Sequence, residues 1–187
     1  AITLLHKILA IEPENAEAHK ILGNAHKALG NMDKAAASFK QAIAIKPDFA
    51  DAHRTLGNVY YEMARFKDSW DENEWRWQCD DAEKLRDFSP PTWQGEDLQN
   101  KTIVLATEQG VGDEVMLAGC LPDLLEKGAR VLLECDKRLV PVINRSFPDV
   151  ECLTKSDPPA VSGQGEIDFH VYIESLGRWL RPDIASY

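Results

Sequence analysis

The sequence predicts an α-helical solenoid of short repeats followed by an α/β domain, on the basis of three observations. Phrases recur at an offset of 34 residues near the N-terminus, and short β-branched runs alternate with helical segments in the second half. Between these regions, Ser89-Pro90-Pro91 and Gly95 interrupt any helix. We therefore expect repeats over residues 1–80, a linker over 81–100 and an incomplete α/β domain over 101–187.

The repeat is visible as identical residues at the fixed offset. These pairs are Pro13 and Pro47, Ala18 and Ala52, His19 and His53, Gly23 and Gly57, and Asn24 and Asn58. Each unit predicts a helix, a turn at Gly30-Asn31 or its equivalent, and a second helix closed by proline. A mid-helix glycine costs about 1 kcal/mol relative to alanine, so Gly23 and Gly57 indicate a close approach by the paired helix.

The units are not all complete. Residues 16–49 and 50–80 form full repeats, whereas residues 1–13 fit only the second helix of a unit, so we expect further repeats before Ala1. The last repeat departs from the apolar pattern of Ala35, Phe39 and Ala42. It has Ser69, Asn73 and Arg76 at the equivalent positions and carries three tryptophans, Trp70, Trp75 and Trp77. Two interpretations stay open: the tryptophans fill the packing where the solenoid meets the next domain, or they form a platform that stacks on sugars.

This pattern resembles the tetratricopeptide (TPR) family, whose repeat is 34 residues long. The resemblance implies a protein or peptide partner on the concave face formed by the first helices. The residues expected to point to that face are Lys20, Asn24, Lys27, Arg54, Asn58 and Tyr61. They could hold an extended peptide through its backbone amides and carboxylates. Alternatively, the asparagines belong to the repeat itself, whatever the protein binds.

The second half predicts a parallel sheet. Strands are expected at residues 102–107, 130–134, 150–153 and 168–173, with helices at 113–127 and 137–146. Strands and helices that alternate in this way form parallel sheets with right-handed crossovers, which predicts a Rossmann-like domain. Ligands of such sheets bind beyond the carboxyl ends of the strands, here at the loop that contains Gly110 and Gly112.

The loop has an unusual charge. Its two glycines are half of a dinucleotide fingerprint, because Val115 takes the third glycine position. Glu108, Asp113 and Glu114 place carboxylates where a pyrophosphate needs free amides, which disfavours NAD, and we expect no cofactor. A carboxylate here could accept a proton from an alcohol as a general base in glycosyl transfer. Alternatively, Asp113 and Glu114 only complement the helix dipole.

Charge and cysteines narrow the remaining classes. Residues 81–187 hold 19 acidic against 11 basic residues, which disfavours a nucleic acid partner. The cysteines, Cys79, Cys120, Cys135 and Cys152, form no CxxC pair and no metal-ligand spacing with histidine. They predict reduced, mostly buried thiols in a cytoplasmic protein without a metal. No apolar run approaches the roughly 20 residues that a membrane helix needs.

Several strings together resemble bacterial TPR-containing glycosyltransferase-like proteins. They are Phe66 to Trp77 with its closing Glu74-Trp75-Arg76-Trp77, Trp93 to Leu98, Glu108 to Asp113, and Ile167-Asp168-Phe169 followed by Glu174-Ser175-Leu176. That family resembles heptosyltransferase-like, two-domain GT-B enzymes. By this likeness, residues 101–187 are the start of the N-terminal, acceptor-side half.

The resemblance also implies roles for single residues. Asp113 matches the aspartate thought to be the catalytic base, and Glu108 is a second catalytic candidate. Substrate-binding candidates are Gln109, Gly110, Gly112 and Glu114. GT-B enzymes hold the nucleotide-sugar donor mainly with the C-terminal half, so we expect transfer only in a longer protein and none in this fragment. The alternative is a non-catalytic TPR scaffold whose α/β domain is degenerate, which the apolar stretch Glu114 to Cys120 favours.

Overall fold

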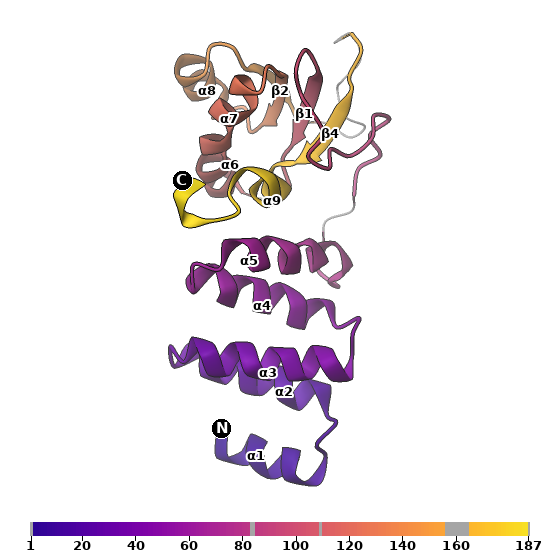
Figure 1. Ribbon diagram of the computed structural model, residues 1–187, viewed down its shortest axis with the longest axis vertical. Coiled ribbons are helices and arrows are strands. Elements are labelled where there is room, and N and C mark those ends of the chain that lie inside the picture. The colour runs from indigo at the N-terminus through magenta and orange to yellow at the C-terminus, as the bar shows by residue number, and fades with distance from the viewer. Residues whose placement is uncertain (1, 83–84, 109, 156–164, 187) are drawn as a thin grey trace. The chain divides into compact units, whose positions relative to one another are not determined.

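The chain folds into two compact units (Figure 1). In the computed structural model, which describes residues 2–82, 85–108, 110–155 and 165–186, the first unit comprises the residues up to 82 together with 181–187. The second unit comprises residues 83–180. We call them the helical unit and the sheet unit. Among the described residues, no helix combines the length and the apolar character needed to cross a bilayer.

The helical unit is a column of antiparallel helices (Figure 1). They are α1 (Ile2–Ile11), α2 (Ala16–Ala28), α3 (Met32–Ile45), α4 (Ala50–Glu62) and α5 (Phe66–Asn73), followed by the 3-10 turn η1 (Glu74–Gln78). Helix α2 packs on α3, α3 on α4, and α4 on α5. The helix pairs predicted from the 34-residue offset are therefore confirmed.

The glycines mark close helix contacts, as predicted. A Cβ built on Gly23 would lie 2.8 Å from Cε1 of Phe39, whose ring is fully buried between α2 and α3. A Cβ on Gly57 would lie 3.1 Å from the backbone nitrogen of Asn73. The paired helices approach this closely only because neither glycine has a side chain.

The recurring histidine and proline form the same contact in both repeats. Nε2 of His19 donates to the carbonyl oxygen of Pro13 at 3.0 Å, and Nε2 of His53 donates to that of Pro47 at 3.0 Å. Each histidine thus satisfies a carbonyl left without a helical partner next to the proline. Their recurrence in the sequence has a structural cause.

The last repeat ends the solenoid differently from the one before it. Helix α5 stops at Asn73, and its tryptophans pack within the helical unit. Trp70 is buried and donates from Nε1 to the carbonyl oxygen of Arg181 at 2.7 Å. Trp75 stacks on His53 with ring centroids 4.0 Å apart, and the guanidinium of Arg76 lies over Trp77. These contacts favour packing over a sugar platform, because each of the three indoles already has a protein partner.

The sheet unit holds four parallel strands in the order β3-β2-β1-β4. The strands are β1 (Thr102–Ala106), β2 (Arg130–Cys135), β3 (Glu151–Thr154) and β4 (Phe169–Tyr172). The predicted parallel sheet is confirmed, and each strand lies within one residue of its predicted bounds at either end.

The helices of the sheet unit are shorter than the sequence predicted. They are α6 (Val111–Leu117), α7 (Leu121–Glu126), α8 (Val140–Ser146) and α9 (Gly177–Leu180), with 3-10 turns η2 (Ala118–Cys120), η3 (Ile173–Leu176) and η4 (Ile184–Ser186), the last of these in the helical unit. The single helix expected over 113–127 is wrong, because η2 interrupts it and a second helix, α7, begins at Leu121 with Pro122 in its first turn. Helix α8 begins at Val140, because Asp136 first closes a turn by accepting from the backbone of Arg138 at 2.8 Å.

The segment that we expected to be a linker packs on the sheet unit. Trp93 and Leu98 are 2% and 0% exposed and belong to the apolar core on one face of the sheet. The backbone nitrogen of Trp93 donates to the carbonyl oxygen of His170 in β4 at 2.8 Å. Phe88 is buried as well and stacks on His170, so the residues from 85 onward belong to this fold.

Candidate functional site

The six residues predicted to bind a peptide lie on the first helices of the two repeats. Lys20, Asn24 and Lys27 come from α2, and Arg54, Asn58 and Tyr61 come from α4. Within each helix the spacing is i, i+4 and i+7, which places the three side chains on one helical face. We call this set the first-helix face.

The basic members of the first-helix face are paired with carboxylates. Nζ of Lys20 lies 2.9 Å from Glu17 and 4.0 Å from Asp51, and Nζ of Lys27 lies 3.5 Å from Glu62 on α4. Partly exposed pairs of this kind contribute at most about 1 kcal/mol each and exchange readily. The face is therefore close to neutral and does not form a cationic clamp.

The uncharged members are the accessible ones. Asn24 and Asn58 are exposed and lie one repeat apart, and Tyr61 is 38% exposed. The Tyr61 ring is held edge-on by Phe66 and Trp70, with centroids 5.3 and 5.9 Å away. An asparagine amide offers both donors and an acceptor, which match the backbone groups of an extended peptide.

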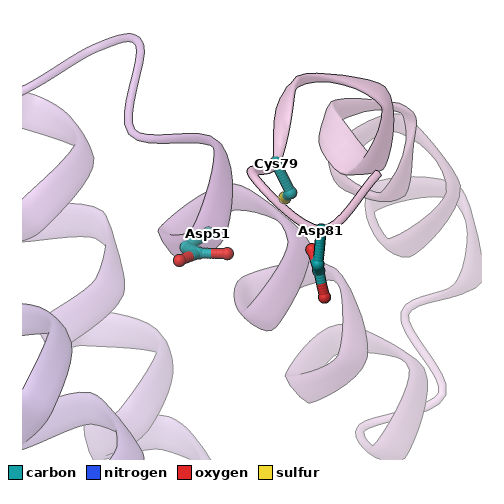
Figure 2. Close-up of side chains that lie close together, drawn as sticks. All are labelled: Asp51, Cys79 and Asp81. Carbon is teal, nitrogen blue, oxygen red and sulfur yellow. The ribbon is translucent and has the colours of Figure 1, made fainter. Parts of the chain in front are cut away.

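The N-terminal end of α4 holds a cluster that the sequence did not reveal. Asp51, Cys79 and Asp81 bring one ligand atom each within 4.8 Å of one another (Figure 2). The guanidinium of Arg54 already bridges the two carboxylates, at 2.9 Å from Asp81 and 3.2 Å from Asp51. Burial raises the pKa of the Cys79 thiol, which disfavours the thiolate that binds metals. We interpret the cluster as a structural ion pair that fastens residue 81 to α4.

In the sheet unit, a cavity of about 360 Å³ adjoins the predicted ligand loop. It lies at the carboxyl ends of β1, β2 and β3, where parallel sheets bind ligands. The lining residues are Gly110, Val111, Glu114, Cys135, Asp136, Lys137, Arg138 and Lys155. Of the predicted site residues, Gly110 and Glu114 therefore meet at one cavity.

The acidic residues of the loop differ in their surroundings. Glu114 is 6% exposed, and its Oε2 accepts from the backbone nitrogen of Asp136 at 2.9 Å. Glu108 is 5% exposed, so it faces the interior, whereas Asp113 is half-buried in the first turn of α6. Gly112 is exposed with open space around its Cα, and Gln109 lies outside the described residues.

The cavity also has basic lining residues that the sequence analysis missed. Lys137 and Arg138 follow β2, and Lys155 follows β3. Arg138 donates from Nε and Nη2 to Asp136 at 2.9 and 2.8 Å, which holds the pKa of that carboxyl well below its usual range. A signal for them exists in the sequence, because each basic residue lies within four residues after the end of a predicted strand and parallel strands end at the same edge.

Comparisons with known proteins concern mainly the helical unit. A family model described as a TPR repeat matches residues 23–63, which confirms the TPR interpretation there. The protein FlbA of Caulobacter vibrioides is 45% identical over 62 residues, which are 32% of this chain and 10% of FlbA. Among solved structures, a variant of the Thermobaculum terrenum O-GlcNAc transferase aligns with a TM-score of 0.41 and 16% identity, over 97% of this chain and 45% of that one. The chain thus spans less than half the length of either protein.

Proposed function

We propose that the helical unit binds an extended peptide segment of a partner protein along the first-helix face. The observation that carries this proposal is the pair of exposed asparagines, Asn24 and Asn58, at equivalent positions one repeat apart. Two amides at a fixed spacing suit the backbone groups of an extended chain, because these groups also recur at a fixed spacing. The TPR match over residues 23–63 supports it.

The chemistry of the face favours recognition of the backbone over recognition of charge. Lys20, Lys27 and Arg54 are each neutralised by a carboxylate, so an acidic peptide gains little unless it displaces one. Tyr61 adds an apolar contact beside Asn58 that suits an aromatic or aliphatic side chain of the peptide. We therefore expect a neutral peptide with one apolar anchor.

Selection of random peptides displayed on phage tests this function. Peptides selected on the whole chain are titrated against an Asn24→Ala/Asn58→Ala variant and against Gln41→Ala, an exposed residue of α3, as a matched control. We expect a loss of affinity of about 5- to 150-fold in the double variant, since two lost hydrogen bonds are worth about 1–3 kcal/mol together. Equal binding to the double variant would show that the peptides use another surface.

A second function is proposed for the sheet unit as the acceptor-side half of a glycosyltransferase-like domain. The order β3-β2-β1-β4 with all pairs parallel supports a Rossmann-like, GT-B type arrangement. The cavity beside Gly110 lies at the carboxyl end of β1, as such a site requires. The nucleotide-sugar donor would bind a further part of a longer protein, and transfer would take place in the cytoplasm. The assignment to the heptosyltransferase-like type rests on the resemblance of the sequence strings alone.

In this mechanism Asp113 is the base. Its carboxylate lies in the first turn of α6, half-buried, where it can accept the proton of an acceptor hydroxyl as that oxygen attacks the sugar. Gly110 and Gly112 leave room for the acceptor, and Gln109 is a candidate contact by the sequence resemblance alone. Glu108, being buried, would act on the site only through its charge, and Glu114 would hold the wall of the cavity.

The base assignment is tested in a protein that extends this chain through the donor half. We expect Asp113→Asn to lower transfer or donor hydrolysis by roughly 100-fold or more with little change in melting temperature. Asp149→Asn, an exposed aspartate away from the cavity, is the control with the same chemical change. Undiminished turnover in Asp113→Asn would refute the assignment. Absence of turnover with every sugar nucleotide would favour the alternative, a TPR scaffold with a degenerate α/β domain.

A further inference from the structure

We propose that Glu114 is a positioning residue for Asp113 and acts by fixing the first turn of α6. This role rests on the second proposed function, since Asp113 is a base only in that function. The two residues are neighbours in the sequence, but their carboxylates have different surroundings. Glu114 is 6% exposed, whereas Asp113 is half-buried.

The first turn of α6 is weak by its own composition. Gly110 precedes the helix and Gly112 is its second residue, and glycine is the poorest helix former apart from proline. The helix is only seven residues long, so it depends on packing against the rest of the unit. Within the turn, the backbone nitrogens of Asp113 and Glu114 donate to the carbonyl oxygen of Gly110 at 3.0 and 3.2 Å. These two bonds hold the backbone that carries Asp113.

The side chain of Glu114 adds a tertiary contact to this turn. Its Oε2 accepts from the backbone nitrogen of Asp136, the residue that follows β2, at 2.9 Å. Successive side chains of a helix project about 100° apart, so Asp113 points in another direction. A Cβ built on Gly110 would lie 3.8 Å from Oδ2 of Asp113, which places that carboxylate beside a residue that lines the cavity. Glu114 therefore anchors the turn, and Asp113 presents its carboxylate next to the cavity.

The loop to which Glu114 is anchored is itself fixed. Asp136 accepts from the backbone nitrogen of Arg138 at 2.8 Å and from its Nε and Nη2 at 2.9 and 2.8 Å. Asp136 and, to a smaller extent, Glu114 raise the pKa of the Arg138 guanidinium, so this cation also compensates the buried charge of Glu114. A buried carboxylate that is bonded to a fixed partner keeps one orientation. The first turn of α6 is thus tied to the end of β2.

Two substitutions of Glu114 separate positioning from a direct part in the chemistry. The amide oxygen of glutamine can still accept from the backbone nitrogen of Asp136, but glutamine has no charge and takes up no proton. Alanine removes the hydrogen bond altogether. A positioning residue is therefore largely replaced by glutamine and not by alanine, whereas a residue that acts through its charge is replaced by neither.

Amide exchange in the whole chain, followed by NMR, tests the anchor without any turnover. We expect Glu114→Ala to speed exchange at Asp113 about tenfold or more, because loss of a charge-assisted hydrogen bond favours local opening. Glu114→Gln should have a smaller effect, and Glu126→Ala, the same change at an exposed residue of α7, none. An equal rise at Leu105 in β1 would contradict a local role.

Kinetics of the longer protein, which includes the donor half, test the consequence for Asp113. We expect Glu114→Ala to lower kcat by roughly 10- to 100-fold, because a small displacement of a reacting group costs much of its effect. The KM for the nucleotide-sugar should not change, since the donor binds elsewhere, and Glu114→Gln should keep most of the activity. Full kcat in Glu114→Ala, or equal losses in the two variants, would overturn the positioning role.

A second variant covers the case in which Glu114→Ala does not fold. Arg138→Gln changes an exposed side chain and loosens the same loop while Glu114 stays in place. It should speed exchange at Asp113 in the same direction, and unchanged exchange there would then overturn the anchor.

The two measurements also separate this role from the base assignment. Turnover that survives Asp113→Asn would remove the base, while faster exchange in Glu114→Ala would still show that Glu114 fixes the turn. Turnover that is lost in Asp113→Asn and kept in Glu114→Ala would retain the base and remove the positioning role.

Discussion

Ala64 occupies the position that Gly30 holds one repeat earlier, and both have a left-handed backbone, with φ of 56° and 73°. Each residue ends the first helix of its repeat and turns the chain into the second. Glycine adopts this conformation without strain, whereas a residue with a Cβ pays about 1–2 kcal/mol for it. The second repeat therefore carries backbone strain that the first does not.

Exchange of these residues tests the strain. We expect Ala64→Gly to raise the free energy of unfolding of the helical unit by about 0.5–1 kcal/mol, since relief of strain exceeds the added entropy of the unfolded chain. Gly30→Ala should lower it by a similar amount. The new methyl group would meet no atom near Gly30, so the strained backbone is the only cost. Urea unfolding followed at the amides of α2 and α4 measures both. Destabilisation by Ala64→Gly would contradict the left-handed assignment.

The contact of Gly23 with Phe39 gives a second prediction. Alanine at position 23 improves helix propensity by about 1 kcal/mol, but its Cβ would lie 2.8 Å from a ring that is 0% exposed and cannot move aside. We expect Gly23→Ala to lower the free energy of unfolding by about 1–3 kcal/mol, the usual cost of overpacking. Asn24→Ala, an exposed change on the same helix, should leave stability nearly unchanged. Equal stability of the two variants would refute the packing role of the glycine.

The repeat could be predicted from sequence because its contacts recur at a fixed offset. Gly23 and Phe39, or His19 and Pro13, lie within one unit of the chain, so local pattern and local structure coincide. The strands were equally clear, because buried parallel strands form short apolar runs between turns. The break at Ala118–Cys120 could have been predicted from Pro122, because proline is tolerated in the first turn of a helix but not in its interior.

The cavity could be predicted only in part. Gly110 and Glu114 were found because they lie in one loop, whereas Lys137 and Lys155 reach the cavity from loops after two other strands. Likewise, Trp93 and Leu98 looked like parts of a linker, since their partners in the core are far along the chain. Contacts of this kind follow from the strand order, which the sequence pattern left open.

We expect the stability of the sheet unit to depend on pH through His170. Burial lowers the pKa of His170 below its ordinary value of 6.5, and Nδ1 donates to the carbonyl oxygen of Pro90 at 2.7 Å while Phe88 covers the ring. Below pH 6.5 the unfolded chain takes up a proton that the folded unit resists. The contribution of the neutral His170 to the free energy of unfolding is therefore fully present above pH 6.5 and falls as the pH drops below that value.

A pH series of urea unfolding tests this dependence. Asp168 also has a lowered pKa, because of Lys101, but its contribution is lost only below the ordinary carboxyl value of 3.8, so the two declines begin at different pH. We expect His170→Gln to remove the decline that begins below pH 6.5, because the sheet unit's segment of the sequence, residues 83–180, holds no other histidine. A decline of the same size in the variant would assign it to another group.

The ion pair between Arg86 and Glu134 gives the last prediction. Nη2 of Arg86 lies 2.5 Å from Oε2 of Glu134, a β2 residue whose side chain is 0% exposed. Arg86→Met would leave that carboxylate buried without its cation, and we expect the free energy of unfolding to fall by about 3–5 kcal/mol. Adding Glu134→Leu removes the stranded charge, so the double variant should recover most of the loss, as buried pairs often contribute little over apolar residues. Thermal unfolding of the single and double variants measures both values. If the double variant is no more stable than Arg86→Met alone, the cost comes from the other contacts of Arg86, such as its cation–π contact with Phe88. In that case the ion pair is not what holds residues 85–88 against the sheet.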